Sequence, residues 1–594
     1  MRESWPRARI FSLFLLMTPD ELQHLRHSLA HLLAAAVLDL WPDAKRAIGP
    51  AIDDGFYYDF EFSTPISEDD FPKIESKMRE ILPTWTAFAR SEVSADEARN
   101  EFVGNPYKLE LIDEFSGEGK NLTLYRSGTY VDLCKGGHTD SLTNVDPESF
   151  KLTKLAGAYW RGSEKNKQLT RIYAAAFETK SELVDYLAML EEAKKRDHRK
   201  LGKELELYTV IDEIGGGLPL FYPRGAVLRR LVENFIITQQ EKRGYVPIWI
   251  PHITKGKLYE ISGHLQKYNA MYPPMHLEDE ADYYLKPMNC PHFMMLYKTQ
   301  PHSYRELPMR WTCTTTNYRY EKSGELSGLT RVRALTQDDC HVFTRPDQIE
   351  SEINLMLDMI DETYRAFTFT DFWVRISTHD PANKEKYIGD PKIWAESEAA
   401  LARLIEKRGW THKVGVGEAA FYGPKLDFMA KDVLGREWQL STIQLDMNLP
   451  QRFELEYVAE DGTKQRPVVI HRAILGSVER FLGILIEHFA GAFPLWLAPV
   501  QVRLSTVSED HLPFARKLHE ELVHAGIRAE IDDSNEKVGK KIRNAAMMKI
   551  PWTIVVGAKE VEGGDFKVNV FGSEEDLVIP QKDLIATVKE KSAL

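Results

Sequence analysis

Three segments far apart in the chain each contain a side chain able to bind a soft or borderline metal ion. Cys290 occurs in KPMNCPH, His341 in TQDDCH and His471 in VIHRAILGSVER. If these side chains share one ion, the stretch from residue 290 to residue 471 must fold so that its middle and both ends meet. One cysteine and two histidines from separate segments, with a fourth position left open, are typical of catalytic zinc sites.

The same three residues have a simpler interpretation. A buried thiol and two hydrogen-bonded histidines are common in protein cores, and the chain offers 4 Cys and 18 His to choose from. The residues around the three segments favour the zinc site.

A hairpin is predicted immediately before His341. Residues 315–321 form a predicted strand on which Arg319 and Glu321 point to one face, because they are two residues apart. Residues 322–328 are rich in turn formers, and residues 330–336 form the return strand. A helix is predicted to open at residues 476–480, with Arg480 near its N-terminal end, where anions are favoured. Arginine suits bidentate binding of triphosphate oxygens.

Seven strings of this chain occur in the order known from one enzyme family. They are the RxE hairpin, the GxxxR helix start, and the segments KPMNCP, RVRxxTQDDxH, FYGPK, WQxxTxQLD and HRAILGS. By these motifs the chain resembles the threonyl-tRNA synthetase family of class II aminoacyl-tRNA synthetases. The resemblance covers nearly the whole chain from about His24 onward.

The resemblance implies an α+β multidomain protein. It places an N-terminal extension at 1–23, an editing domain at 24–185, a helical linker at 186–204, a class II catalytic domain with an antiparallel sheet at 205–497, and an α/β anticodon-binding domain at 498–594. The length alone suggests three or four domains. The ubiquitin-like domain with which many family members begin is expected to be absent. Strand–helix alternation over residues 502–556 predicts parallel strands.

Residues 1–17 combine basic residues with a short apolar run. A signal or transit peptide is one interpretation, but no small-residue cleavage site follows. Thr18 and Pro19 instead predict the N-cap and first turn of a helix. We therefore expect the preceding residues to be an over-extended start.

A second group of possible ligands lies in the first domain. His27 and His31 share one helix face, and Cys134 and His138 follow a predicted strand at residues 124–133. From chemistry alone, these four side chains could form a zinc site. The resemblance instead implies an editing site of the bacterial type, in which the HxxxH and CxxxH side chains position a hydrolytic water without a metal.

Two neighbours of Cys134 bear on that site. Asp132 lies one strand repeat before Cys134, on the same face, and is a predicted partner for the water or for the substrate's amino group. Gly137 stands where the family usually has proline.

The resemblance also assigns roles around the zinc candidates. Arg319 would contact the α-phosphate of ATP and Glu321 the adenine amino group, with Mg²⁺ bound to the phosphates. The full set comprises Arg319, Glu321, Arg331, Gln439 and Arg480 for ATP, Met288, Gln337, Asp339, Tyr422 and Gln444 for threonine, and Arg319, Lys425 and Arg480 for catalysis.

The chemistry of threonine explains why the site needs a metal and why the chain needs a second site. Valine has the same shape as threonine, and an apolar pocket separates the two only about a hundredfold. If the amino and hydroxyl groups of threonine both bind the zinc, with Asp339 accepting from the hydroxyl, valine is rejected. Serine keeps both groups and differs by one methyl, worth roughly 1–3 kcal/mol. Mischarged serine must therefore be removed afterwards.

Composition and charge are compatible with this interpretation. The chain is 43% hydrophobic and 28% charged, as in ordinary soluble enzymes, and its four cysteines show no paired spacing, which indicates a reducing, cytoplasmic compartment. No segment approaches the roughly 20 apolar residues that span a membrane. Because the net charge is −13, any contact with RNA must come from a local basic patch.

Together, these observations predict ATP-dependent ligation of L-threonine to tRNA(Thr) through threonyl-adenylate, with hydrolysis of mischarged Ser-tRNA(Thr). By resemblance, residues 223–251 form the interface of a homodimer. One alternative is a synthetase-like RNA-binding regulator without activation, which the intact Arg319, Glu321 and Arg480 disfavour. The other is a synthetase for serine, proline or histidine, which the three zinc candidates disfavour.

Overall fold

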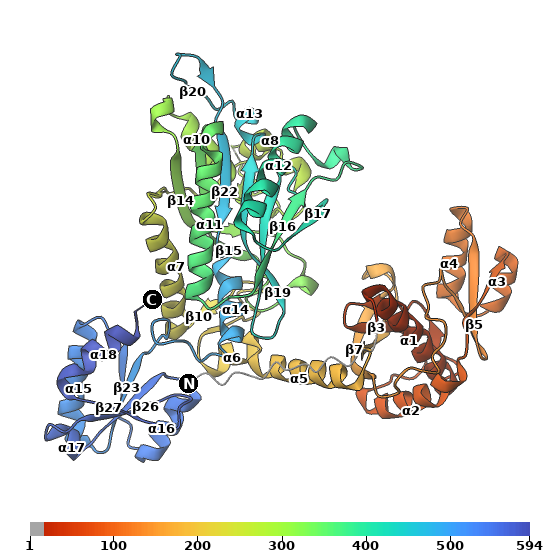
Figure 1. Ribbon diagram of the computed structural model, residues 1–594, viewed down its shortest axis with the longest axis horizontal. Helices are drawn as coiled ribbons and strands as arrows, with labels where there is room; N and C mark the ends of the chain where they lie inside the picture. The colour runs from red at the N-terminus through yellow and green to blue at the C-terminus, as the bar shows by residue number, and fades with distance from the viewer. Residues whose placement is uncertain (1–16, 279, 594) are drawn as a thin grey trace. The chain divides into compact units, whose positions relative to one another are not determined.

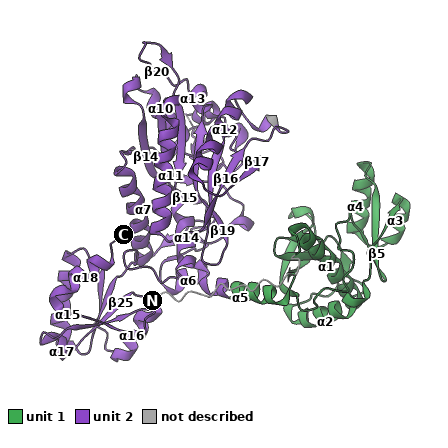
Figure 2. Ribbon diagram, in the orientation of Figure 1, with its two compact units in different colours: residues 1–191 green, residues 192–594 purple. Residues whose placement is uncertain are grey.

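The computed structural model describes residues 17–278 and 280–593, so most of the predicted N-terminal extension lies outside the described residues. The chain forms two compact units, the first ending at Glu191 and the second beginning at Glu192 (Figure 2). Among the described residues, no helix has the length and apolar character needed to cross a membrane.

The first unit is built on the long helix α1 (Pro19–Leu40), whose predicted start is confirmed (Figure 1). Thr18 is the N-cap, and its backbone N–H donates to Glu21 Oε2 at 2.7 Å while Glu21 N–H donates to Thr18 Oγ1 at 3.3 Å. The buried face of α1 packs in one apolar core with strands of a five-stranded sheet. One turn of α1 therefore brings His27 and His31 to the same part of the unit.

Between α1 and residue 179, the described residues form two sheets and three further α-helices. The five-stranded sheet contains β1 (Lys45–Arg46), β2 (Ala51–Ile52), β3 (Gly55–Glu61), β7 (Phe150–Tyr159) and β8 (Gln168–Ala176). The three-stranded sheet contains β4 (Ala89–Val93), β5 (Leu122–Ser127) and β6 (Tyr130–Leu133). The helices are α2 (Phe71–Ile81), α3 (Ala95–Glu101) and α4 (Pro106–Gly117).

The single strand predicted at residues 124–133 is wrong, because the chain reverses within it. Ser127 pairs with Tyr130, which leaves a two-residue turn between β5 and β6. Gly128 has φ of +57° in this turn, a conformation that glycine adopts readily. The reversal places Asp132 and Cys134 on the second strand of a hairpin and just after it.

The predicted charged helix of the linker is two helices. α5 (Lys180–Arg196) ends before Asp197, and α6 (His198–Glu204) begins after it. Asp197 has non-helical backbone angles and caps α6, because its side chain accepts a hydrogen bond from Arg199 N–H at 2.7 Å. The break sets the position at which His198 enters the second unit.

An eight-stranded sheet forms the centre of the second unit (Figure 1). Its pairs are antiparallel except for the two outermost, β11 with β14 and β16 with β17. In spatial order it contains β11 (Val246–Pro247), β14 (Met309–Tyr318), β15 (Ala334–Thr344), β22 (Val468–Ala473), β19 (Glu437–Asp446), β18 (Lys425–Lys431), β16 (Phe372–Thr378) and β17 (His412–Val416).

Helices cover one face of this sheet with a large apolar core. Val342 of β15 and Ile470 of β22 share that core with residues of α7 (Pro223–Glu241), α11 (Ile349–Ala366) and α14 (Val478–His488). Because side chains alternate along a strand, their neighbours His341 and His471 point to the opposite face. The helix predicted to open at residues 476–480 is confirmed as α14, capped by Ser477.

Two expectations about neighbouring strands are wrong. β14 ends at Tyr318, so Arg319 and Glu321 lie in the following loop; Glu321 N–H donates to Arg319 O at 2.8 Å, which turns the chain out of the ladder. β15 begins only at Ala334. The loop between them contains the short 3-10 helix η5 (Ser323–Glu325).

The last part of the chain forms a mixed five-stranded sheet. β24 (Ala529–Asp532), β23 (Val502–Thr506) and β25 (Trp552–Val556) are parallel, as predicted. β26 (Phe566–Val570) and β27 (Leu577–Ile579), which lie beyond the residues covered by that prediction, are added antiparallel. The accompanying helices are α15 (Leu512–His524), α16 (Val538–Met547), α17 (Ala558–Val561) and α18 (Leu584–Lys591).

A buried ion pair joins the centre of the large sheet to the segment before α14. Arg472 Nη1 donates to Asp338 Oδ2 at 3.0 Å, and both side chains are fully buried. Asp338 also accepts the backbone N–H groups of Ile474 at 2.9 Å and Leu475 at 3.0 Å. The charges of Arg472 and Asp338 therefore compensate each other within the protein interior.

Replacing Asp338 with Asn should therefore lower the free energy of unfolding by about 3 kcal/mol, because Arg472 would keep a buried charge without a counter-ion. Urea unfolding followed by tryptophan fluorescence measures the change. Asp347→Asn is the matched control, since Asp347 pairs with Arg345 but its side chain is 66% exposed, and it should change stability by less than about 0.5 kcal/mol. Equal effects of the two substitutions would contradict the role of the buried pair.

Candidate functional site

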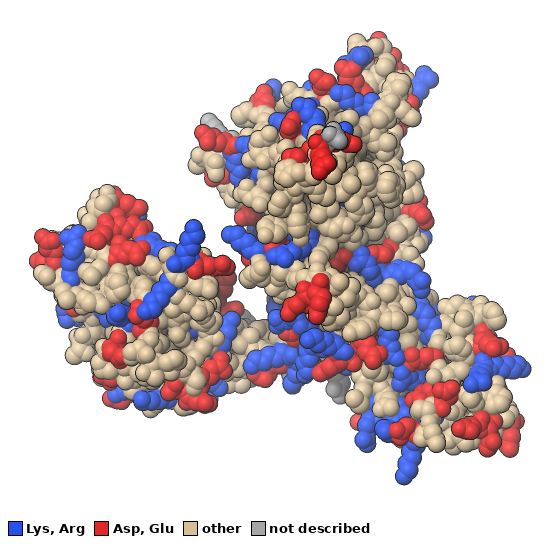
Figure 3. Space-filling view, turned by 180° about the vertical axis from the view of Figure 1, so that it is seen from behind, with Lys and Arg blue, Asp and Glu red and all other residues tan. Residues whose placement is uncertain are grey.

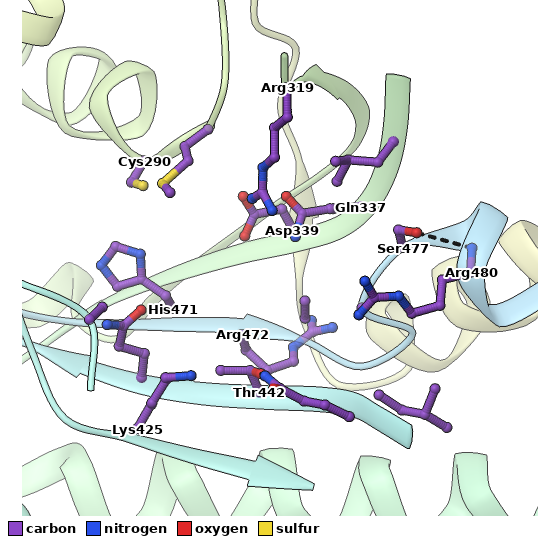
Figure 4. Close-up of a pocket in the computed structure, with 18 of the residues that line it drawn as sticks. Cys290, Arg319, Gln337, Asp339, Lys425, Thr442, His471, Arg472, Ser477 and Arg480 are labelled. Carbon is purple, nitrogen blue, oxygen red and sulfur yellow. Dashed lines mark hydrogen bonds between the residues drawn. The ribbon is translucent and has the colours of Figure 1, made fainter. Parts of the chain in front are cut away.

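The three predicted zinc ligands lie together in the second unit. His341 in β15 stands directly opposite His471 in β22, with ring centroids 4.3 Å apart. Cys290 opens helix α10 (Cys290–Lys298), which is part of a second apolar cluster beside these strands. The ligand atoms of all three residues lie within 4.8 Å of one another, and all three residues are buried. Figure 4 shows Cys290 and His471 facing the same space.

The hydrogen bonding of the two imidazoles fits a metal site. Both ring nitrogens of His341 are buried without a hydrogen-bond partner, which is costly in a protein interior. Burial, with His471 and Arg472 nearby, lowers the pKa of His341 well below its usual value, so the ring is neutral and keeps a free lone pair. His471 Nε2 meets Asp446 Oδ2 at 2.8 Å, a carboxylate contact typical of metal-binding histidines.

The thiol completes a suitable donor set. Burial raises the pKa of Cys290 in the protein alone, and a bound cation would reverse this effect by favouring the thiolate. One sulfur and two imidazoles, open on one side to a cavity, match the ligands that zinc takes in catalytic sites. The residues present therefore fit a zinc ion.

The cavity beside this cluster, of about 450 Å³, brings together nearly all of the other predicted site residues. Of the residues predicted for this site, His341 does not line the cavity, although its ligand atom lies within 4.8 Å of those of Cys290 and His471. The predicted residues that line the cavity are Met288, Cys290, Arg319, Glu321, Arg331, Gln337, Asp339, Tyr422, Lys425, Gln439, Gln444, His471 and Arg480.

A chain of hydrogen bonds orients Asp339 next to the zinc candidates. Asn289 Nδ2 donates to Asp339 Oδ2 at 2.9 Å, and Lys286 Nζ donates to Asn289 Oδ1 at 2.8 Å. Because the ammonium can only donate, it fixes the orientation of the amide. Burial raises the pKa of Asp339, and the bond from Asn289 opposes that shift. The sequence analysis missed Lys286 and Asn289, although both belong to the KPMNCP string.

Positive charge converges at the other end of the cavity. Arg480 Nε donates to Thr330 O at 3.0 Å, and its backbone N–H donates to Ser477 Oγ at 3.1 Å (Figure 4). Burial lowers the pKa of Arg480, and the nearby charges of Arg319 and Arg331 lower it further. Three mutually repelling arginines form an environment suited to a polyphosphate.

Several predicted residues are held by acidic partners or by the backbone. Glu321 accepts two hydrogen bonds from Arg331, at 2.8 and 3.0 Å. Lys425 Nζ donates to Asp427 Oδ2 at 2.7 Å, and Gln439 Nε2 donates to Asp427 Oδ1 at 2.8 Å. Buried Asp427 therefore fixes one wall of the cavity, and it is a residue that the sequence analysis missed.

The first unit gathers the second predicted group around a cavity of about 390 Å³. The ligand atoms of His27, His31, Cys134 and His138 lie within 4.8 Å of one another. His27 Nε2 lies 3.0 Å from Cys134 Sγ and 3.4 Å from His31 Nε2. His138 Nε2 lies 3.7 Å from the same sulfur.

Asp132 is the buried centre of the group. Its carboxylate meets Tyr58 OH at 2.6 Å, Lys108 Nζ at 2.7 Å and Tyr130 OH at 2.9 Å. His31 Nδ1 lies 3.2 Å from the same carboxylate. Tyr58 and Lys108 come from β3 and α4, and only the fold brings them to Asp132.

This network sets the charges of the group. Burial opposes ionisation of His31, but its contacts with Asp132 and Cys134 outweigh burial and raise its pKa to about 9. Burial likewise opposes ionisation of Cys134, but hydrogen bonds with His138, His27 and His31 lower its pKa to about 3. Near neutral pH the site therefore contains a thiolate beside an imidazolium.

The loop at Gly137 has a conformation that proline cannot adopt. Gly137 has φ of +86°, whereas the proline ring fixes φ near −65°. A proline at position 137 would therefore require another backbone conformation between Cys134 and His138.

Comparison with known proteins shows the family of the chain. Residues 275–489 match the tRNA synthetase class II core domain (G, H, P, S and T), residues 501–591 an anticodon binding domain, and residues 122–173 the second additional domain of threonyl and alanyl tRNA synthetases. A threonine–tRNA ligase of Rubrobacter xylanophilus is 51% identical over 93% of this chain and 86% of its own length. A threonine–tRNA ligase of Gloeobacter violaceus is 48% identical over 97% of this chain and 93% of its own length. The chain belongs to the threonyl-tRNA synthetase family.

Solved structures agree with this family. The RNA binding domain of the threonyl-tRNA synthetase of Cryptosporidium parvum is 35% identical, with a TM-score of 0.64 over 66% of this chain and 98% of that one. A threonyl-tRNA synthetase, ThrRS-1, of Aeropyrum pernix is 30% identical, with a TM-score of 0.58 over 67% of this chain and 95% of that one. Within this threonyl-tRNA synthetase family member, the class II core match contains Cys290, His341 and His471, and the second additional domain match contains Asp132 and Cys134.

The low pKa of Cys134 predicts an unusual pattern of thiol alkylation. An ordinary cysteine reacts about tenfold faster with each pH unit below its pKa near 8.5, since only the thiolate attacks. Cys134 is already a thiolate above about pH 3, so its rate with iodoacetamide should be nearly constant from pH 5 to pH 8. Mass spectrometry of the labelled peptide measures the rate.

Cys134→Ser identifies the background labelling, because the other three cysteines are buried. A rate that rises tenfold per pH unit over this range would contradict the thiolate.

Proposed function

We propose that the chain ligates L-threonine to tRNA(Thr) in an ATP-dependent reaction through threonyl-adenylate. The observation that supports this most directly is a single cavity with Cys290 and His471 of the Cys–His–His cluster at one end and converging arginines at the other. An amino acid with a hydroxyl group suits the first end, and a triphosphate suits the second. Activation requires the two to meet between these ends.

In the first step, a carboxylate oxygen of threonine attacks the α-phosphorus of ATP, and the bond to pyrophosphate breaks. Arg319 would hold the α-phosphate and Arg331 and Arg480 the other phosphates, with Mg²⁺ entering as part of the nucleotide substrate. Such catalysis relies on positioning and on stabilisation of charge. The tRNA hydroxyl then attacks the threonyl carbonyl and AMP leaves.

Asp339 and its partners are proposed to select the hydroxyl group. The bond from Asn289 leaves Asp339 able to accept from a substrate hydroxyl, which valine lacks. Zinc held by Cys290, His341 and His471 would supply an open coordination position for the amino and hydroxyl groups of threonine. Serine satisfies both requirements, so the cavity admits it.

The first unit is proposed to remove that error by hydrolysing Ser-tRNA(Thr). The imidazolium of His31, Asp132 and the ammonium of Lys108 can hold a water and the seryl amino group by hydrogen bonds and charge. Threonine carries one more methyl group, which a cavity shaped for serine would exclude.

Partners beyond the small substrates are also proposed. Basic side chains gather along the end of α5 and along α6 (Figure 3), and this local patch suits the tRNA backbone despite the negative net charge. A homodimer is proposed through the edge of the large sheet at β11, where Val246 is 55% and Trp249 78% exposed. The four free thiols suit a cytoplasmic location.

ATP–pyrophosphate exchange measured across the amino acids tests the proposed activation. Threonine should support strong exchange, serine detectable exchange and valine almost none. Absence of exchange with every amino acid would favour the alternative of an RNA-binding regulator, and preference for proline or histidine would favour another synthetase.

Cys290→Ser should lower the zinc content of the purified protein and the threonine-dependent exchange together, because three protein ligands are the minimum for a catalytic zinc. Elemental analysis and circular dichroism report zinc content and folding independently of activity. Cys313→Ser, another buried thiol, is the control and should retain zinc. A zinc-free Cys290→Ser variant with full exchange would contradict the assignment.

Combining His31→Ala with Cys134→Ala should leave threonylation unchanged and let Ser-tRNA accumulate. The reason is that the two residues act in the first unit, whereas activation takes place in the second. Mischarging with radiolabelled serine measures the effect, and His24→Ala, exposed on the same helix, is the matched control. Clearance of Ser-tRNA at the wild-type rate by the double variant would show that editing is not located there.

A further inference from the structure

The loop between β14 and β15 forms part of the arginine-rich end of the cavity. Thr330 and Arg331 of this loop line the cavity together with Arg480. On the function proposed above, the loop must take one position when the nucleotide binds. The loop projects beyond the ends of both strands, so the strand ladder does not fix it.

His198, the first residue of α6, contacts this loop from outside the cavity. Its side chain is nearly fully buried, and its ring contacts groups on two sides. Nδ1 lies 2.6 Å from Glu487 Oε1 on α14, and Nε2 lies 3.0 Å from the backbone N–H of Leu329. The backbone N–H of His198 also donates to Glu487 Oε1, at 3.1 Å.

These partners define the tautomer. The N–H of Leu329 can only donate, so Nε2 of His198 must be the acceptor, and the ring proton is on Nδ1, where it is donated to Glu487. Asp197, His198 and Glu487 lie close enough to hold a metal ion. Both ring nitrogens are already engaged, however, so this cluster is a hydrogen-bonded junction.

Two glycines make room for the contact. A Cβ at Gly328 would lie 2.2 Å from His198 Nε2, and this glycine has φ of +48°. A Cβ at Gly483 of α14 would lie 3.4 Å from His198 Cδ2 and 3.2 Å from Leu329 Cβ. Because Gly328 and Gly483 have no Cβ, the backbones of the loop and of α14 can both pack closely against the ring of His198.

The contact leads directly to the phosphate-binding groups. Leu329 is completely buried, and the next residue, Thr330, accepts the hydrogen bond from Arg480 Nε at 3.0 Å. Arg331 follows and pairs with Glu321. Fixing Leu329 thus fixes the carbonyl that orients Arg480 and the start of the segment that presents Arg331.

We propose that His198 is a positioning residue for ATP, which holds the loop at residues 323–331 in its nucleotide-binding position through Nε2 and Leu329 N–H. The linker helix α6 thereby forms part of the support of the ATP site. The opposite view is that His198 only packs α6 against α14 through Glu487.

Two isosteric substitutions separate these roles. Asn places its amide near the position of Nδ1, so His198→Asn keeps the bond to Glu487 and loses the bond to Leu329. Gln reaches the position of Nε2, so His198→Gln keeps an acceptor for Leu329 and loses Glu487. The proposal predicts that the KM for ATP in exchange rises about tenfold in His198→Asn, the cost expected for one lost buried hydrogen bond. It also predicts that His198→Gln restores most of the affinity and that the KM for threonine stays within about twofold in both.

His488→Asn is the matched control, since this histidine follows Glu487 at the end of α14 and its side chain hydrogen-bonds Thr368. Normal ATP affinity in folded His198→Asn, or equal losses in the Asn and Gln variants, would overturn the proposal. If His198→Asn does not fold, Gly328→Ala should give the same ATP defect by forcing the loop off the ring, and a normal KM there would also overturn it. Arg480→Ala tests the ATP site itself: if its KM for ATP is normal, the proposed function is wrong, independently of His198.

Discussion

The pairing register of β15 with β22 is the constraint on which the second unit depends. It sets His341 opposite His471, while β19 sets Gln444 opposite His471 from the other side. A slip of β15 by one residue would turn His341 into the apolar core and Val342 toward the cavity, and the same slip of β22 would exchange His471 and Ile470. The large core beneath the sheet therefore sets the positions of the proposed zinc ligands, although it contains none of them.

The two sites use the same residue types with opposite electrostatics. In the second unit, burial lowers the pKa of His341 and raises that of Cys290, so the neutral ring of His341 offers a lone pair to a cation. In the first unit, Asp132 raises the pKa of His31 to about 9, and hydrogen bonds from histidines lower that of Cys134 to about 3, against the effect of burial in both cases. A group that is already an internal ion pair is better suited to orienting a polar substrate or a water than to binding zinc.

The sequence allowed prediction of those parts in which function is concentrated in short strings. KPMNCP, TQDDCH and HRAILGS each contain one proposed ligand, and the cap at Thr18 follows from local chemistry alone. Residues that act through tertiary contacts were missed: Lys286 supports Asn289 from within a buried region, and Lys108 reaches Asp132 from α4. The turn at Gly128 and the antiparallel strands β26 and β27 were also missed, because alternation of side chains does not distinguish one strand from a tight hairpin or fix the direction of pairing.

Cys290, His341 and His471 are proposed to hold one zinc ion with a position open to threonine. Zinc K-edge X-ray absorption of the purified protein tests this most directly, using a Cys134→Ser background so that the first unit can contribute no sulfur. The account predicts one sulfur at about 2.3 Å, two imidazole nitrogens at about 2.0 Å and a light-atom shell that changes when threonine is added. A spectrum with no sulfur ligand, with several sulfurs, or with no response to threonine would contradict it.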